Sequence, residues 1–329
     1  MSNFQIFTDS SCDLDKSQRS NAKLEYFRMG VIINGKAYHA DLDYQEYSIQ
    51  DFYGWVGDTK NVCKTSLITA DEVESKCIPY LEQGIDVVYL ATTTALTGSL
   101  NVFELAAKSL REKYPERKIV GIDTKRAGLA LGLLCLDCAK MRDDGASLDE
   151  IIAYVNENNL HYNLLGTVST LKYLKAAGRV SGASAFFGNL LSVKPVIVSD
   201  EVGNNYVVEK VKGSKKSWDR LFELTADLLD PDHKLIYLGQ GMAEESASYL
   251  KQRFVNELHA EVVDYWVGPI IGLSCGPGVI HIVFRGKVAK IEKNRLHSGQ
   301  GDLPFQIRSI RVSIFNRKRH PLAGCRMKL

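Results

Sequence analysis

The 329-residue sequence predicts an α/β protein in which a three-layer α/β/α domain with a parallel sheet precedes a smaller two-layer α/β domain with a mixed sheet. The first half alternates short apolar runs with helix patterns, which is typical of a parallel sheet covered on both faces. From His161 the rhythm changes, and a hairpin-like turn precedes two helices. We therefore expect domains at residues 1–162 and 163–286, followed by a separate extension at 287–329.

In the first domain, each expected strand leads into a helix. The strands are predicted at Phe4–Phe7, Asp86–Ala91 and Lys118–Ile122, and the helices at 17–22, 99–113 and 127–143. Two more helices should begin at the capping boxes Thr69–Glu72 and Ser147–Glu150. In such a box, a hydroxyl residue and an acidic residue three positions later satisfy free backbone N–H groups.

The second domain contains six strand patterns and two helix patterns. The strands are predicted at Leu164–Val168, Pro195–Ser199, Tyr206–Lys212, Leu235–Leu238, Val262–Val267 and Val279–Phe284, and the helices at 215–229 and 244–258. A hairpin turn is expected at 200–205. The segments 178–184 and 272–278 are rich in small residues, and we expect both to be loops whose backbone can approach a ligand closely.

Composition places the chain among ordinary globular proteins, with 45% hydrophobic and 24% charged residues. Seven scattered cysteines in a chain of this size favour a reducing, cytoplasmic environment. The longest apolar run, Val267–Phe284, contains four glycines and two prolines, which favours a loop and a buried strand over a membrane span.

The pair Cys135 and Cys138 lies in an apolar helix pattern, so we expect core cysteines and no metal site.

The C-terminal extension is strongly basic. Residues 287–329 hold 11 lysines and arginines and 2 acidic residues, whereas residues 1–286 hold 30 and 37. Such an extension is often simply solvated, but it can also bind nucleic acid or an anionic membrane surface. The chain has no phosphate-binding P-loop, no dinucleotide glycine fingerprint and no nucleophile elbow, which weakens an enzymatic interpretation.

Hydroxyl side chains cluster where strands of the parallel sheet end. They are Thr8, Ser10 and Ser11; Thr92, Thr93, Thr94 and Thr97; and Thr124, with a further pair at Thr65 and Ser66. Strand carboxyl ends and helix amino termini share one edge of such a sheet, and that edge commonly binds anions. The clusters predict a carboxylate or phosphate site, although Ser and Thr are also common helix caps.

Six ordered motifs resemble those of the DegV family of bacterial fatty-acid-binding proteins. They are Thr8–Leu14, Thr65-Ser66, Thr93–Ser99, Ile122–Gly132, Gly178–Gly182 and Gly268–Gly278, and the resemblance covers residues 4 to about 286. It implies two α/β domains with a fatty acid in a tunnel between them, and a non-catalytic carrier that presents the fatty acid to an ATP-dependent kinase for acyl phosphate formation. No cofactor, metal or nucleic acid is expected, although transient contact with a membrane surface is compatible with this role.

The resemblance also implies roles for individual residues. The carboxylate would be held by Thr65 and Thr97, with Ser66, Thr94 and Ser274 nearby. The acyl chain would lie against Phe186, Phe187, Leu190, Leu191, Ile270 and Ile271. Lys212 and Arg179 would face the kinase.

The sequence departs from the family pattern at three places. Leu67 and Ile68 replace Gln-Pro, Ser274 replaces a His, and Lys212 lies where some members have a docking Arg. Serine cannot carry a positive charge, and lysine cannot make a bidentate contact. Two alternatives therefore stay open: a transferase that handles phosphate or carbonyl groups at the same strand ends, and a nucleic-acid or membrane-surface binder that acts through the basic extension.

Overall fold

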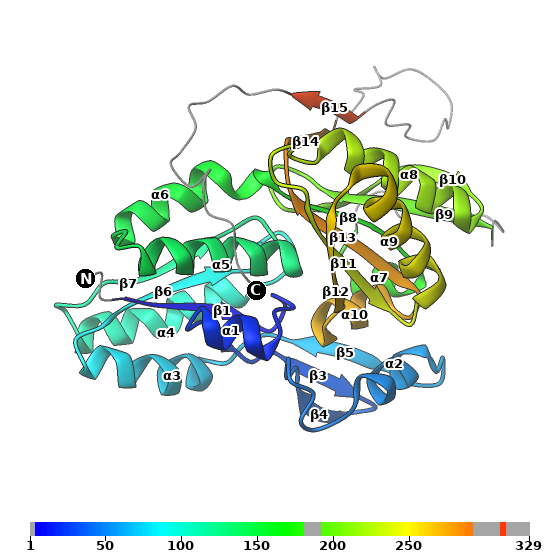
Figure 1. The fold of residues 1–329 in the computed structure, drawn as a ribbon. Coiled ribbons are helices and arrows are strands. Elements are labelled where there is room, and N and C mark those ends of the chain that lie inside the picture. Colours follow the sequence, from blue (N-terminus) through cyan, green and yellow to red (C-terminus); the bar gives the residue numbers. More distant parts are fainter. Residues whose placement is uncertain (1–3, 181–191, 292–309, 314–329) are drawn as a thin grey trace, which may run out of the picture.

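A parallel sheet covered by helices on both faces forms the first part of the computed structural model, which describes residues 4–180, 192–291 and 310–313 (Figure 1). The strand order is β2-β1-β6-β7, with β1 Phe4–Asp9, β2 Glu25–Phe27, β6 Asp86–Ala91 and β7 Ile119–Asp123. Helices α3 (Ala70–Glu82) and α4 (Ser99–Lys113) cover one face, and α5 (Leu129–Asp143) and α6 (Leu148–Asn158) the other; the short α1 (Lys16–Asn21) follows β1. The predicted three-layer arrangement is confirmed.

Helix α5 is buried along nearly its whole length because it lies between two sheets. It packs against β1 and β6 on one side and against β8 (Tyr162–Thr167) and β13 (Val279–Arg285) on the other. Cys135 and Cys138 are fully buried on this helix, as predicted, and burial raises the pKa of both thiols. They are therefore core side chains.

The two predicted capping boxes differ in outcome. At α6 the box is complete, because Ser147 accepts from the Glu150 N–H and the Glu150 carboxylate accepts from the Ser147 N–H. At α3 only half of it forms. Thr69 accepts from the Glu72 N–H at 3.2 Å, but the Glu72 carboxylate accepts instead from the backbone and guanidinium of Arg28. A bidentate guanidinium contact outcompetes a single backbone N–H.

A small antiparallel sheet between β2 and α3 was not predicted. It has the order β4-β3-β5, with β3 Gly30–Ile33, β4 Lys36–His39 and β5 Cys63–Ser66, and α2 (Ile49–Gly57) connects β4 to β5. The turn between β3 and β4 is Asn34-Gly35, with φ values of 51° and 83°. This sheet matters for the site because β5 carries Thr65 and Ser66.

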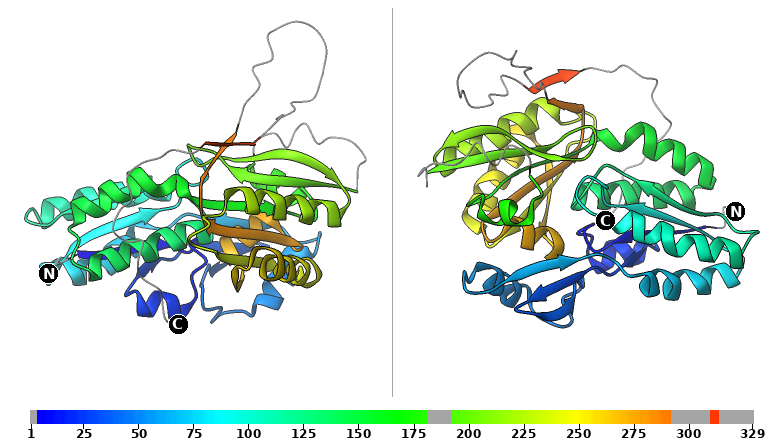
Figure 2. Two further views of the ribbon diagram at one scale, coloured as in Figure 1. Left: turned by 45° about the horizontal axis from the view of Figure 1, so that its top comes forward. Right: turned by 180° about the vertical axis from the view of Figure 1, so that it is seen from behind.

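The second part of the chain forms a mixed sheet of order β10-β9-β8-β13-β11-β12. The remaining strands are β9 Val193–Ser199, β10 Asn205–Lys212, β11 Leu235–Gly241 and β12 Glu261–Trp266. Helices α8 (Ser214–Leu228) and α9 (Glu244–Leu258) cover one face, and β9 and β10 form the predicted hairpin. The other face turns toward the first sheet, as both views in Figure 2 show.

The prediction of a loop at 272–278 is wrong for the first four of these residues, which are helical. Pro269–Cys275 form the helix α10, with Gly268 as N-cap and Pro269 in the first turn. Proline is favoured in the first turn of a helix, where its missing N–H costs nothing, and a positive φ of 76° at Gly276 ends the helix. A second short helix, α7 (Lys172–Ala177), follows β8 and packs against α10. The turn η1 (Asn159–His161) joins α6 to β8.

Part of the basic extension is ordered as a strand pair, in which β14 (Val288–Ile291) pairs with β15 (Ile310–Ser313). None of the helices among the described residues is long and apolar enough to cross a membrane. The small-residue loop after Gly178 is described only to Val180.

Candidate functional site

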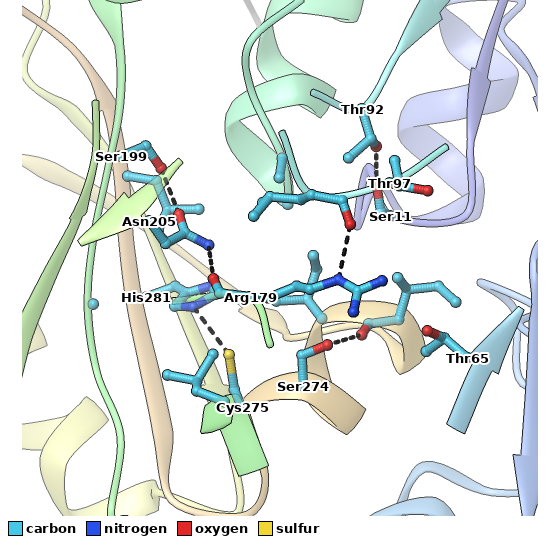
Figure 3. Close-up of a pocket in the computed structure, with 18 of the residues that line it drawn as sticks. Ser11, Thr65, Thr92, Thr97, Arg179, Ser199, Asn205, Ser274, Cys275 and His281 are labelled. Carbon is cyan, nitrogen blue, oxygen red and sulfur yellow. Dashed lines mark hydrogen bonds between the residues drawn. The ribbon is translucent and has the colours of Figure 1, made fainter. Parts of the chain in front are cut away.

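A cavity of about 410 Å³ lies between the parallel sheet, the small sheet and the mixed sheet (Figure 3). Its apolar lining comes mainly from Met29, Leu96, Leu164, Val168, Leu174, Ile197, Ile270 and Ile271. Its polar lining falls into two groups, hydroxyls from the first two sheets and a set of polar side chains from the mixed sheet. The volume falls within the usual range for small-molecule sites.

The cavity collects most of the residues predicted for the site. Seven of them line it: Thr65, Ser66, Thr97, Ser274, Ile270, Ile271 and Arg179. Thr94, predicted near the carboxylate, does not, because its side chain is exposed and donates to Asp123 at 2.5 Å. Lys212 is exposed at the end of β10, away from the cavity lining. Phe186, Phe187, Leu190 and Leu191 lie outside the described residues.

A buried carboxylate organises the deepest hydroxyls. Asp9, at the end of β1, accepts hydrogen bonds from the backbone and side chain of Ser11, from the backbone and side chain of Thr92, and from the Tyr89 hydroxyl. The side chains of Asp9 and Tyr89 are fully buried. Five donors replace the water that the carboxylate loses on burial. The sequence analysis placed Ser11 and Thr92 in its hydroxyl clusters but did not assign them to the site, and it did not include Asp9 or Tyr89.

This network decides which hydroxyls still have a proton to donate to a ligand. The Ser11 and Thr92 hydroxyls donate to Asp9 at 2.7 and 2.9 Å. The Ser274 hydroxyl donates to the carbonyl of Ile270, one turn earlier in α10, at 3.3 Å. A hydroxyl has one proton, so these three act toward the cavity chiefly as acceptors.

The hydroxyls of Thr65 and Thr97, in contrast, can donate their protons to a ligand. The Thr65 hydroxyl has no hydrogen-bond partner among the described residues. The Thr97 hydroxyl accepts from the Ser99 N–H at 3.3 Å and shares a 3.1 Å hydrogen bond with the Ser99 hydroxyl. When Ser99 donates in that pair, the Thr97 proton is free for a ligand. The Ser66 hydroxyl, which also lines the cavity, has no partner among these residues either, so the geometry leaves Thr65, Ser66 and Thr97 as the available hydroxyl donors.

Two helix amino termini also line the cavity. Thr97 and Gly98 precede α4, Gly128 precedes α5, and all three line the cavity. The N-cap residues are glycines without a side chain to cap the helix, although Thr97 accepts from the Ser99 N–H of α4. Free N–H groups and the positive end of the helix dipole favour an anion there.

Arg179 supplies the cation nearest to these donors. Its Nε atom donates to the Leu96 carbonyl at 2.9 Å, and its side chain extends from the mixed-sheet side of the cavity toward Thr65 and Thr97 (Figure 3). Within the described part of the chain it makes no ion pair with a carboxylate. A guanidinium in this position raises the positive potential at the hydroxyl wall.

The opposite wall carries polar residues that the sequence analysis missed. They are Thr167, Ser199, Asn205 and His281 from the mixed sheet, with Cys275 from α10. His281 is 6% exposed, and burial lowers its pKa to about 4, so its imidazole is neutral at pH 7. Its only sequence signal is a histidine at an inward-facing position of an otherwise apolar strand.

The described residues contain no group of three or more His, Cys, Asp or Glu side chains arranged to hold a metal ion. The residues that line the cavity offer hydroxyls, an amide, an imidazole and a guanidinium, which is the chemistry of a site that binds a negatively charged or oxygen-bearing organic molecule.

The fold and cavity define a class: α/β proteins with a parallel sheet, a mixed sheet and a cavity between them. Residues 3–287 match the family model described as "Uncharacterised protein, DegV family", and the chain belongs to this family. A DegV domain-containing protein of Clostridium perfringens is 34% identical over 294 residues, which cover 87% of this chain and 98% of that protein. The predicted resemblance is confirmed.

Solved structures of the family support the fold over most of the chain. A fatty acid (stearic acid)-binding protein from Eubacterium ventriosum superposes with a TM-score of 0.77 at 24% identity, covering 86% of this chain and 98% of that one. A fatty acid binding DegV family protein from Streptococcus agalactiae gives 0.73 at 25% identity, with coverages of 87% and 100%. Both relatives are thus described as fatty-acid binders.

Proposed function

We propose that this protein binds a long-chain fatty acid in the cavity between its sheets, with the carboxylate at Thr65 and Thr97 and the acyl chain along the apolar lining. The observation that carries the proposal is the arrangement of the cavity, which combines available hydroxyl donors and two helix amino termini with an extended apolar lining. The fatty-acid-binding relatives support it.

The energetics fit such a ligand. A chain of about 16 carbons gains on the order of 10 kcal/mol when fully buried, at about 0.8 kcal/mol per CH₂. Ordering the ligand offsets part of this gain. The carboxylate leaves water only if donors replace its hydration, and the two hydroxyls, the helix amino termini and the Arg179 guanidinium are such donors. We therefore expect the complex to persist through purification.

We further propose that the protein is a cytoplasmic carrier without catalytic activity, which presents the bound carboxylate to a separate ATP-dependent kinase. The kinase would transfer the γ-phosphoryl group of ATP to the carboxylate, giving an acyl phosphate and ADP. Lys212 is exposed and suited to docking, whereas Arg179 lies at the cavity and suits the carboxylate itself. Brief contact with a membrane surface would supply the fatty acid.

Mass spectrometry of an organic extract from the purified, denatured full-length protein tests the binding proposal. We expect close to one fatty acid per chain, either as purified or after incubation with a fatty-acid mixture and removal of unbound lipid. An extract that stays empty after incubation contradicts the proposal.

A second experiment tests the kinase partnership separately. Wild-type protein and Ser274→His, each loaded with the same fatty acid, are offered to a fatty acid kinase, and acyl phosphate is measured; we expect the higher turnover from Ser274→His. Turnover of the loaded wild-type protein supports the carrier role. No turnover by a kinase that accepts another loaded DegV protein contradicts it while leaving fatty-acid binding intact.

A further inference from the structure

The wall opposite the carboxylate donors is built around a buried histidine. His281 lies on β13, and its cross-strand neighbours are Gly166 on β8 and Gly239 on β11. A Cβ atom at Gly166 would lie 3.0 Å from the imidazole Cδ2 atom, so the glycine makes room for the ring. Gly166, Ile197 and His281 lie in one row across the sheet, and all three line the cavity.

The imidazole lacks hydrogen-bond partners on the protein side. Its Nε2 atom lies 3.9 Å from the Cys275 sulfur, which is a weak contact, and its Nδ1 atom is itself inaccessible and has no partner among the described residues. A neutral imidazole has one donor and one acceptor nitrogen. Leaving such a group buried and unpaired is unfavourable, because it has lost its hydration without replacement.

Other polar groups accompany His281. Asn205 accepts from the Ser199 hydroxyl at 2.8 Å and donates to the Arg179 carbonyl at 3.3 Å, which leaves its amide group a second N–H. Figure 3 shows Ser199, Asn205, His281 and Cys275 together on the side facing away from Thr65 and Thr97. A fully saturated acyl chain that crossed the cavity would place methylene groups against this polar side.

We propose that the preferred ligand is a fatty acid with a hydroxyl group on its acyl chain, and that His281 binds that hydroxyl. This inference rests on the proposed function. A hydroxyl both donates and accepts, so it can pair with the Nε2 atom in either tautomer of the imidazole and can also accept from Asn205. A methylene group that displaces water from the polar wall makes none of the hydrogen bonds that the water made there. A hydroxyl group can make them in place of the water.

Binding measurements on delipidated full-length protein test this inference. The probes are octadecanoic acid and a series of monohydroxyoctadecanoic acids that differ in the carbon bearing the hydroxyl. We expect wild-type protein to bind at least one hydroxy acid about tenfold more tightly than octadecanoic acid, the effect of one buried hydrogen bond that would otherwise be unmade. His281→Val should abolish that preference and bind octadecanoic acid severalfold more tightly.

Two further variants make the result specific. His281→Gln keeps a donor and an acceptor and should retain part of the preference, whereas His233→Val, a matched change at an exposed position, should behave like the wild type. The inference is overturned if wild-type protein binds octadecanoic acid at least as tightly as every hydroxy acid, or if His281→Val keeps the preference. Failure of wild-type protein to bind any of the acids instead contradicts the proposed function. The wild-type comparison decides the question even if His281→Val does not fold.

Discussion

Replacing Thr97 by valine removes one carboxylate donor while nearly preserving volume. The hydroxyl lines the cavity in the loop before α4, and its hydrogen bonds within the described part of the chain are those with Ser99. In the proposed complex its proton points to the fatty-acid carboxylate. The substitution therefore tests a single interaction and leaves the apolar contacts of the acyl chain in place.

The expected loss follows from the kind of hydrogen bond involved. A hydrogen bond to a charged group contributes about 1.5–3 kcal/mol, which corresponds to a roughly 10- to 150-fold weaker affinity. The fold itself should lose less, about 1 kcal/mol, because the hydroxyl also accepts from the Ser99 N–H at the start of α4. Affinity and stability should thus respond to different degrees.

Isothermal titration with hexadecanoic acid measures the affinity, and chemical denaturation measures the free energy of unfolding. Thr94→Val is the matched control, because Thr94 lies three residues away in the same loop but outside the cavity lining. Thr65→Val, alone and combined with Thr97→Val, shows whether the two hydroxyls act on one carboxylate, since donors to a shared acceptor give non-additive losses.

Two results would refute this reasoning. If Thr97→Val binds hexadecanoic acid within twofold of the wild type, Thr97 is a helix-start residue without a role in binding. If Thr94→Val weakens binding as much as Thr97→Val does, the loop acts through its conformation, and the assignment of free protons in the cavity is wrong.

Three other substitutions or conditions have defined outcomes. Asp9→Asn sets an amide against donors from Ser11, Thr92 and Tyr89, and chemical denaturation should show a loss of about 3 kcal/mol in the free energy of unfolding; a loss below 1 kcal/mol would mean the network is unimportant. Ser147→Ala removes the hydroxyl half of the capping box of α6 and should cost about 1 kcal/mol by the same measurement, with no change in ligand affinity. Burial lowers the pKa of His281 to about 4, so between pH 6.5 and 4 the unfolded chain binds more protons, and the free energy of unfolding should fall by up to roughly 3 kcal/mol as the pH drops through this range. In His281→Val, the free energy of unfolding should not show this fall between pH 6.5 and 4. If the variant has the same pH profile as the wild type, the fall does not come from His281.

Periodicity was sufficient to predict the bounds of several long or buried elements. The helix patterns at 99–113 and 244–258 and the strand at Asp86–Ala91 have the predicted bounds in the structure. Such segments bury a continuous apolar stripe or run, and the stripe is visible in the sequence. The division of the chain into domains at residue 162 stays a prediction.

Short elements were missed because three or four residues carry too little periodicity. The small sheet with β3, β4 and β5 is an example, although Asn34-Gly35 is a strong hairpin signal that would have located its first turn. The last four residues of helix α10 were predicted as a loop because glycines outweighed the signal from Pro269 in its first turn.

The hydroxyl clusters were placed at the correct edge of the sheet, but the sequence treated their members as equivalent. What distinguishes them is the destination of each proton, which depends on contacts between residues far apart in the chain. Ser11 and Thr92 are separated by 81 positions and donate to the same oxygen of Asp9. A side chain that stabilises a buried carboxylate of the protein with its only proton cannot donate that proton to a carboxylate of the ligand.

The same reasoning applies to the opposite wall. In the sequence, His281 alternates with Val279 and Val283 and looks like one more core position of a buried strand. Only the pairing of β13 with β8 and β11 shows that glycines flank the ring and that the ring lines the cavity. A family resemblance predicts where a ligand binds, but the hydrogen bonds left unmade on the cavity wall determine which ligand of that class fits best. For this chain, those unmade bonds lie at both walls, so the ligand should be polar at two places rather than at its carboxylate alone.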